Sequence, residues 1–83
     1  MSSLYNKKMD DKEYIKRLGI KLQMLRKVNG VSQDELVNAL YIDKSYYSKL
    51  ERGISNPSIT YLKHIAEYFK IELSELLNVQ QIV

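Results

Sequence analysis

An eleven-residue stretch near the middle of the chain, DKSYYSKLERG at residues 43–53, combines cationic, hydroxyl and aromatic side chains with a closing glycine. Wound as an α-helix at about 100° per residue, it gathers five polar side chains on one carboxylate-free arc: Lys44, Ser45, Ser48, Lys49 and Arg52. Tyr47 and Leu50 fall on the opposite, core-facing side, and Tyr46 lies at the border of the arc. Lysine can donate to guanine O6 and N7, and serine can serve donor or acceptor edges. Such a face therefore suits the major groove of DNA.

Only a few residues separate this expected helix from the one before it. A short helix, a three- or four-residue turn and a helix with a cationic outer face make a helix-turn-helix. The pattern is of moderate specificity, because many helical proteins expose lysines on a solvated face, and that alternative stays open at this point.

Other kinds of site have little support in the sequence. There are no cysteines, which excludes disulfides and thiolate metal sites and fits a reducing cytoplasm. His64 lies off the apolar stripe of its segment and has no acidic companions, and Asp10-Asp11 fits helix capping better than a paired-carboxylate site. No glycine-rich phosphate loop exists. We therefore expect a protein that is not an enzyme and has no metal, cofactor or small-molecule ligand.

The charge distribution suggests a polyanionic partner. The formal net charge is +3, and residues 1–30 carry eight cations against three carboxylates. A basic segment of this kind favours binding to a polyanion, although lysines on a solvated helix face explain it about as well. No apolar run approaches a membrane span and no signal region is evident, so a soluble cytoplasmic protein without membrane contact is expected.

Caps and apolar spacing predict five helices and no strand. Asp10 with Glu13 predicts an N-cap with a capping box, and Asn29-Gly30 ends that first helix. Caps of the next three helices are expected at Ser32 (with Glu35), Asp43 and Ser58. A last helix is expected within residues 72–79. Residues 1–9 are predicted to form a loose tail. Residues 10–83 are predicted to form a single all-α domain, a compact five-helix bundle.

From Ile15 to Leu77 the sequence resembles the Xre/Cro-type helix-turn-helix family of bacterial and phage transcriptional regulators. The matching pieces are Arg26, VSQDEL at 31–36, SKLERG at 48–53, NPS at 56–58 and IELSELL at 71–77. The Tyr-x-Ser-x-Leu-Glu-Arg-Gly helix is also similar to that of restriction-modification controller proteins.

The resemblance implies roles for particular residues. Base edges would be contacted by Lys44, Ser45 and Lys49, with Tyr46 and Ser48 as secondary contacts. Phosphates would be contacted by Gln33, Ser32 and Arg52, helped by backbone N–H groups at a helix N-terminus. Arg26 and Glu51 would form a shielded ion pair that ties the first helix to the third.

Two positions depart from the family pattern. Tyr41 stands where the family favours glycine in the turn, and it carries a steric penalty if its backbone is left-handed. Val37 stands where alanine is usual. Both substitutions bear on the angle between the second and third helices.

The C-terminal segment carries apolar residues that predict a two-fold dimer interface: Leu73, Leu76, Leu77, Val79 and Ile82. The alternative is that half of them close the core. A symmetric dimer would place two recognition helices about 34 Å apart and require a pseudo-palindromic operator in double-stranded DNA. The sequence thus predicts a dimeric repressor or autoregulator. The competing hypothesis is an antitoxin-like or antirepressor-binding protein-interaction module that uses the same helices.

Overall fold

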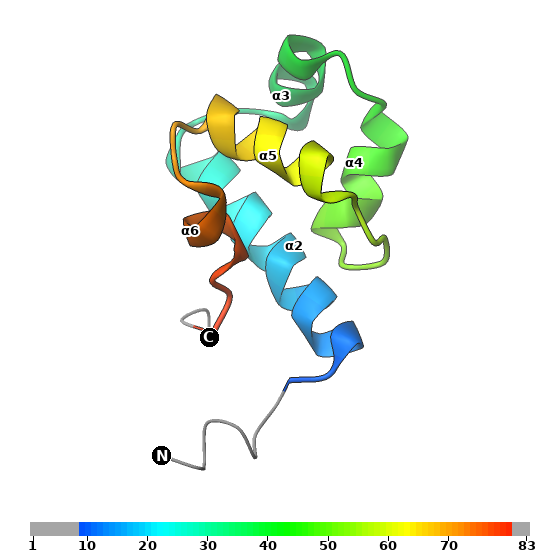
Figure 1. The fold of residues 1–83 in the computed structure, drawn as a ribbon. Coiled ribbons are helices and arrows are strands. Elements are labelled where there is room, and N and C mark those ends of the chain that lie inside the picture. The colour runs from blue at the N-terminus through cyan, green and yellow to red at the C-terminus, as the bar shows by residue number, and fades with distance from the viewer. Residues whose placement is uncertain (1–8, 81–83) are drawn as a thin grey trace.

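The computed structural model describes residues 9–80, and these residues form five α-helices and no strand (Figure 1). In chain order the helices are α2 (Asp11–Val28), α3 (Gln33–Leu40), α4 (Lys44–Glu51), α5 (Ile59–Tyr68) and α6 (Leu73–Leu77). The predicted all-α five-helix architecture is confirmed. Most of the expected N-terminal tail, residues 1–8, lies outside the described residues. Met9, its last residue, packs against the core and so belongs with the folded part.

Four of the five helices begin at a side-chain cap, as the sequence predicts. Ser32 and Glu35 form a complete capping box, in which the Glu35 backbone N–H donates to Ser32 Oγ at 3.0 Å and the Ser32 N–H donates to Glu35 Oε1 at 2.9 Å. Single caps begin the other three helices, at Asp10, Asp43 and Ser58. These bonds satisfy backbone donors that the first helical turn leaves without an intrahelical partner.

The capping box predicted at Asp10 is only half formed. Asp10 Oδ1 accepts from the Glu13 backbone N–H at 2.8 Å, but the Glu13 carboxylate pairs with Arg17 Nε at 2.9 Å instead of returning to the cap. Arg17 is four residues further along the same face, where an ion pair competes with the cap for this carboxylate. The prediction of a reciprocal bond from the Asp10 backbone to the Glu13 side chain is therefore wrong.

The turn between α3 and α4 is built on a left-handed tyrosine. Tyr41, at φ 57° and ψ 45°, follows α3 directly, and its backbone N–H donates to Val37 O. Its side chain is 94% exposed, so little packing compensates for the strain of a Cβ in this region. The steric penalty anticipated for Tyr41 is thus present in the structure.

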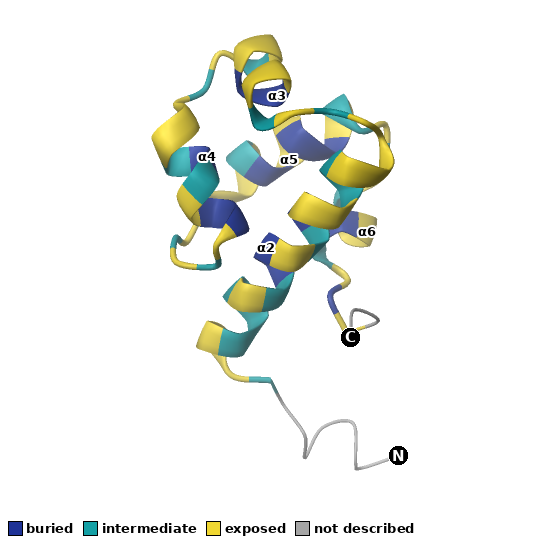
Figure 2. Ribbon diagram, turned by 180° about the vertical axis from the view of Figure 1, so that it is seen from behind, coloured by how far each residue is buried: buried dark blue, intermediate teal, exposed yellow. Residues whose placement is uncertain are grey.

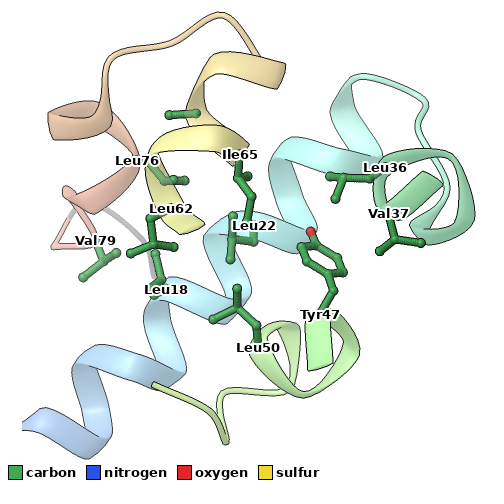
Figure 3. Close-up of a cluster of buried hydrophobic side chains, with 11 residues drawn as sticks. Leu18, Leu22, Leu36, Val37, Tyr47, Leu50, Leu62, Ile65, Leu76 and Val79 are labelled. Carbon is green, nitrogen blue, oxygen red and sulfur yellow. The ribbon is translucent and has the colours of Figure 1, made fainter. Parts of the chain in front are cut away.

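The core gathers apolar side chains from every helix and from the segment after α6 (Figure 3). The largest completely buried residues are Leu22, Leu36, Tyr47, Leu50, Ile65, Leu76 and Val79. Val37, bulkier than the residue usual there, is accommodated at 4% exposure. The inward positions predicted for Tyr47 and Leu50 are confirmed, and their burial fixes which face of α4 points outward.

Helix α2 holds α4 through a very close backbone crossing. A Cβ built on Gly19 would lie 2.6 Å from the carbonyl oxygens of both Leu50 and Glu51, so only hydrogen fits there. A Cβ on Gly53, just past the end of α4, would lie 2.8 Å from Lys16 Cα. Real Cβ atoms do not approach other atoms this closely, and both glycines are therefore required by the crossing.

The same helix holds α6. Lys21 Nζ donates to the carbonyl oxygens of Glu75 at 2.7 Å and Asn78 at 3.1 Å, and the Tyr14 hydroxyl donates to Leu77 O. These donors serve carbonyls that a helix C-terminus leaves free, and a cation there also complements the helix dipole. Within residues 9–80, none of the helices has the length and apolar composition needed to cross a bilayer.

Candidate nucleic-acid interface

Helices α3 and α4 are joined by a three-residue turn, residues 41–43, to form a helix-turn-helix. The turn is fixed at both ends, because the Ile42 N–H donates to Val37 O at 3.0 Å and Asp43 caps α4 through the Tyr46 N–H at 2.8 Å. Each of the two helices has buried residues on one side, against the common core, and exposed residues on the other (Figure 2).

The outward side of α4 carries the residues predicted to contact DNA. Lys44, Ser45 and Lys49 are exposed, Ser48 is half-buried, and Arg52 is exposed just past the C-terminal end of the helix. We call Lys44, Ser45, Ser48, Lys49 and Arg52 the α4 face. The structure brings them to one side of α4 and its C-cap. Their contacts with DNA remain a prediction.

Tyr46 occupies the edge of the α4 face and is half-buried. Its ring packs edge-on against Tyr61 of α5, with ring centroids 5.0 Å apart and an interplanar angle of 82°. Burial raises the pKa of Tyr61 to about 12. Tyr46 therefore connects α4 to α5, and its expected secondary contact with bases stays a prediction.

An acidic residue that the sequence analysis did not single out lies at the N-terminal end of the α4 face. Asp34 Oδ1, on α3, is 2.8 Å from Lys44 Nζ, and the two side chains are 68% and 54% exposed. Helix α4 itself contributes no carboxylate to this face, but α3 does. The turn length could have suggested this proximity, but side-chain periodicity within one helix could not.

The predicted ion pair between Arg26 and Glu51 is present and shielded. Arg26 Nε donates to Glu51 Oε2 at 2.6 Å and Arg26 Nη2 donates to Oε1 at 3.0 Å, in the two-pronged geometry that favours arginine over lysine. The side chains are only 11% and 2% exposed. Arg26 Nη1 also donates to Val31 O at 3.0 Å. The pair joins α2 to the C-terminal end of α4 and to the segment before α3.

Gln33, an expected phosphate contact, takes part in this network. Its Nε2 donates to Glu51 Oε1 at 2.9 Å, which turns one amide N–H inward. Ser32 Oγ accepts the capping bond from Glu35, and its own O–H remains chemically able to donate to an anion. The phosphate roles of Gln33, Ser32 and Arg52 remain predictions.

The network shifts the pKa of its members. Burial on its own raises the pKa of Glu51, but the hydrogen bonds from Arg26 and Gln33 outweigh it and lower that pKa. The hydrogen bond to Glu51 raises the pKa of Arg26. Burial and the nearby Glu51 carboxylate raise the pKa of Tyr47 far above its ordinary value. At neutral pH this junction thus holds a charged pair beside a neutral tyrosine.

The predicted dimer residues divide into core and surface. Leu76 and Val79 are completely buried within one chain, so they offer no surface to a second chain and the predicted interface is corrected to exclude them. Leu73 and Leu77 are half-buried. Beside them lies a hollow of about 380 Å³ lined by Lys63, Ala66, Glu67, Ile71, Glu72 and Leu73. Ile82 lies outside the described residues.

Residues 9–80 contain no group of three or more histidine, cysteine or acidic side chains arranged to hold a metal ion. His64 is exposed, as predicted.

Comparison with known proteins gives consistent matches. A helix-turn-helix domain family matches residues 19–82. The chain is 38% identical over 63 residues to the control protein C.MunI of Mycoplasma sp, covering 75% of this chain and 85% of that protein. It is 36% identical over 64 residues to the HTH-type transcriptional regulator SlrR of Bacillus subtilis, covering 76% of this chain but only 42% of that protein. It thus spans less than half of SlrR.

Solved structures share the fold. The clp gene regulator ClgR of Corynebacterium glutamicum matches with a TM-score of 0.72 at 28% identity, covering 77% of this chain and 68% of that one. A hypothetical transcription factor from Neisseria, NHTF, matches with a TM-score of 0.77 at 25% identity, covering 88% and 84%.

Proposed function

Because the chain belongs to the helix-turn-helix family of Xre-type transcriptional regulators, we propose that it binds double-stranded DNA as a homodimer and acts as a repressor or autoregulator at a pseudo-palindromic operator. In this proposal α4 enters the major groove and the N-terminal end of α3 lies against a phosphate. No cofactor, metal or small-molecule ligand takes part.

One observation carries the proposal: the α4 face is largely exposed to solvent, is rich in cations and hydroxyls, and belongs to a helix that is held by contacts from α2 and α5. Lys44 and Lys49 can donate to guanine O6 and N7, while Ser45 can serve donor or acceptor edges. Arg52, beyond the helix end, is placed for phosphate instead of bases. Contacts of the first kind give specificity and those of the second give affinity and position.

The rigidity of α4 supports a role in recognition. Gly19 fixes the approach of α2, the Arg26–Glu51 pair fixes the C-terminal end of α4, and Tyr61 packs against Tyr46. A side chain that distinguishes bases must be held in place, because a displaced donor loses both distance and angle to its acceptor.

The test is in-vitro selection from a random duplex pool, run in parallel for the wild type and a Lys44/Ser45/Lys49 triple-alanine variant. We expect a two-fold-symmetric sequence motif for the wild type and no motif for the variant. Circular dichroism should find the variant folded, because all three side chains are exposed. Binding that depends on salt but enriches no sequence would reduce the function to electrostatic attraction and contradict the proposal.

The alternative of a protein-interaction module has one observation in its favour. Ile20, Met24 and Val28 follow one another at four-residue spacing on α2 and are 42%, 46% and 78% exposed. An exposed apolar stripe of this kind is typical of protein contacts. If the selection gives no motif, this surface becomes the first place to substitute in a search for a protein partner.

A further inference from the structure

We propose that Asp34 is a positioning residue that increases sequence specificity, by holding the Lys44 ammonium so that its remaining N–H donors face base edges instead of the phosphate backbone. This inference rests on the DNA-binding function proposed above.

The geometry that carries the inference is an exposed ion pair between the two helices of the helix-turn-helix. Asp34 is the second residue of α3 and Lys44 is the first residue of α4, and their charged atoms are 2.8 Å apart. Asp34 is not needed as a helix cap, because Ser32 and Glu35 form the capping box of α3. Its carboxylate is therefore available to act on Lys44.

This pair differs from the other ion pairs among the described residues. Glu13–Arg17 and Lys63–Glu67 each join residues four apart on a single helix, where they support that helix. Arg26–Glu51 is shielded from solvent and fixes the packing of α2 on α4. Asp34–Lys44 is exposed, joins two helices, and involves a member of the α4 face.

The chemistry of the ammonium explains how a held lysine can still contact a base. An ammonium has three N–H donors, and one of them suffices for Asp34. The other two match the two acceptors of guanine in the major groove, O6 and N7. The pair can therefore stay intact while Lys44 binds a base.

A contact between Lys44 and a phosphate would have the opposite effect on Asp34. The ammonium would have to leave the carboxylate, which would then stand unpaired beside a polyanion and be repelled by it. Asp34 thus disfavours the sequence-independent use of Lys44 without opposing its use on a base. Removing the carboxylate should increase non-specific binding and leave cognate binding no tighter.

The experiment measures the affinity of each variant for the selected operator and for a shuffled duplex of equal length, across a series of salt concentrations. In Asp34→Asn, Lys44 is free to contact a phosphate. Binding to the shuffled duplex should tighten about fivefold at 0.15 M salt, and the salt slope should steepen by about 0.9, as one more released counterion requires. Operator binding should not tighten, so the specificity ratio should fall about fivefold.

Three further variants isolate the cause. Glu67→Gln breaks a surface lysine–carboxylate pair of similar length on α5 and changes the net charge equally, so it should leave the specificity ratio unchanged. Asp34→Glu keeps a carboxylate and should preserve the ratio. In a Lys44→Met background, Asp34→Asn should have no further effect on it.

Specific outcomes would overturn the inference. If Asp34→Asn tightens binding to both duplexes by the same factor, Asp34 acts only by general repulsion of DNA. If neither affinity changes, or if Asp34→Glu also lowers the ratio, the carboxylate does not position Lys44. A wild-type protein with no preference for any duplex would instead refute the proposed function itself, and the inference with it.

Discussion

Lys49 lies in the last turn of α4, on the α4 face, and is exposed, and it forms no ion pair within residues 9–80. We predict that Lys49→Ala weakens operator binding by about 1–3 kcal/mol and relaxes base choice at one position, as loss of a direct base contact requires. Fluorescence anisotropy on the operator and on single-base variants would measure both effects.

A control for Lys49 removes a cation elsewhere. Lys63 on α5 is 58% exposed and paired with Glu67, so Lys63→Ala should change affinity less and leave base choice unaltered. If Lys49→Ala instead weakens binding to every duplex by the same factor, Lys49 contacts phosphate.

The Arg26–Glu51 pair should contribute to the free energy of unfolding as a buried ion pair does, and not as an exposed one. Glu51→Gln preserves the shape of the side chain but leaves the guanidinium of Arg26, itself only 11% exposed, without a charged partner. Breaking a buried pair in this way costs about 3–5 kcal/mol, which urea denaturation would measure at pH 7. A loss below about 1 kcal/mol, the range of exposed pairs, would contradict the shielding of this pair from solvent.

The lowered pKa of Glu51 makes this contribution dependent on pH. A carboxyl whose folded-state pKa lies below its unfolded value of about 4.3 stabilises the fold fully above that value. The stabilisation is lost as pH falls through the folded-state pKa. The free energies of unfolding of the wild type and Glu51→Gln should therefore converge on acidification below about pH 4. A constant difference between them at every pH would show that the ionisation of Glu51 is not its source.

At the scale of secondary-structure elements, the strained turn after α3 predicts a stabilising substitution. Tyr41→Gly relieves a left-handed conformation that costs non-glycine residues roughly 1–2 kcal/mol, and the added freedom of glycine in the unfolded chain offsets about half of that. We expect a net gain of about 0.5–1 kcal/mol in the free energy of unfolding, measured in urea.

Two variants of Tyr41 make the cause visible. Tyr41→Asn should be intermediate, because asparagine tolerates the left-handed region, while Tyr41→Val should be the least stable of the series. The same order is not expected from loss of packing, since Tyr41 is 94% exposed. If Tyr41→Gly were the least stable variant of the series, the proposed strain in the Tyr41 backbone would be refuted.

The helices themselves could be predicted from the sequence because their signals are local. Ser32 and Glu35 are three residues apart and need only each other, and the spacing of Tyr47 and Leu50 places both on one side of α4 whatever packs there. Local geometry also explains the failure at Glu13, where two partners at short range, the cap and Arg17, compete for one carboxylate. Sequence spacing cannot rank them.

What the sequence could not predict depends on distance in space. The pairing of Asp34 with Lys44 follows from the angle between α3 and α4, which no periodicity within one helix contains. The same holds for Lys21, whose ammonium meets carbonyls more than fifty residues away. The sequence predicts Leu76 and Val79 at a dimer interface, whereas both are buried within one chain, because apolar spacing does not distinguish burial within one chain from burial between two.

At the scale of the whole molecule, the proposed dimer should depend on the exposed part of α6 and its neighbouring hollow. Leu73 is half-buried and lines that hollow. We predict that Leu73→Gln weakens self-association about tenfold, or about 1.4 kcal/mol, as measured by sedimentation equilibrium. Ile59→Gln is the matched control, because Ile59 is an apolar residue that is 58% exposed and lies at the first position of α5, outside the lining of the hollow.

The dimer proposal has a clear point of failure. A wild-type chain that remains monomeric at tens of micromolar, or a Leu73→Gln variant that associates as tightly as the wild type, would contradict it. Circular dichroism on both variants separates a weakened interface from a lost fold.

Helix α2 contacts the proposed dimerisation helix and the proposed recognition helix at nearly the same level. Lys21 and Tyr14 bind the carbonyls that end α6, and Gly19 lies against the carbonyls that end α4. In a dimer joined through α6, helix α2 of each protomer would set the distance between the two α4 helices, because it contacts both α6 and α4. Adding a single base pair between half-sites shifts them by about 3.4 Å and rotates them by about 35°. We expect the contacts of α2 with α6 and α4 to resist that change, so the spacer length of the operator should be as strictly selected as its bases.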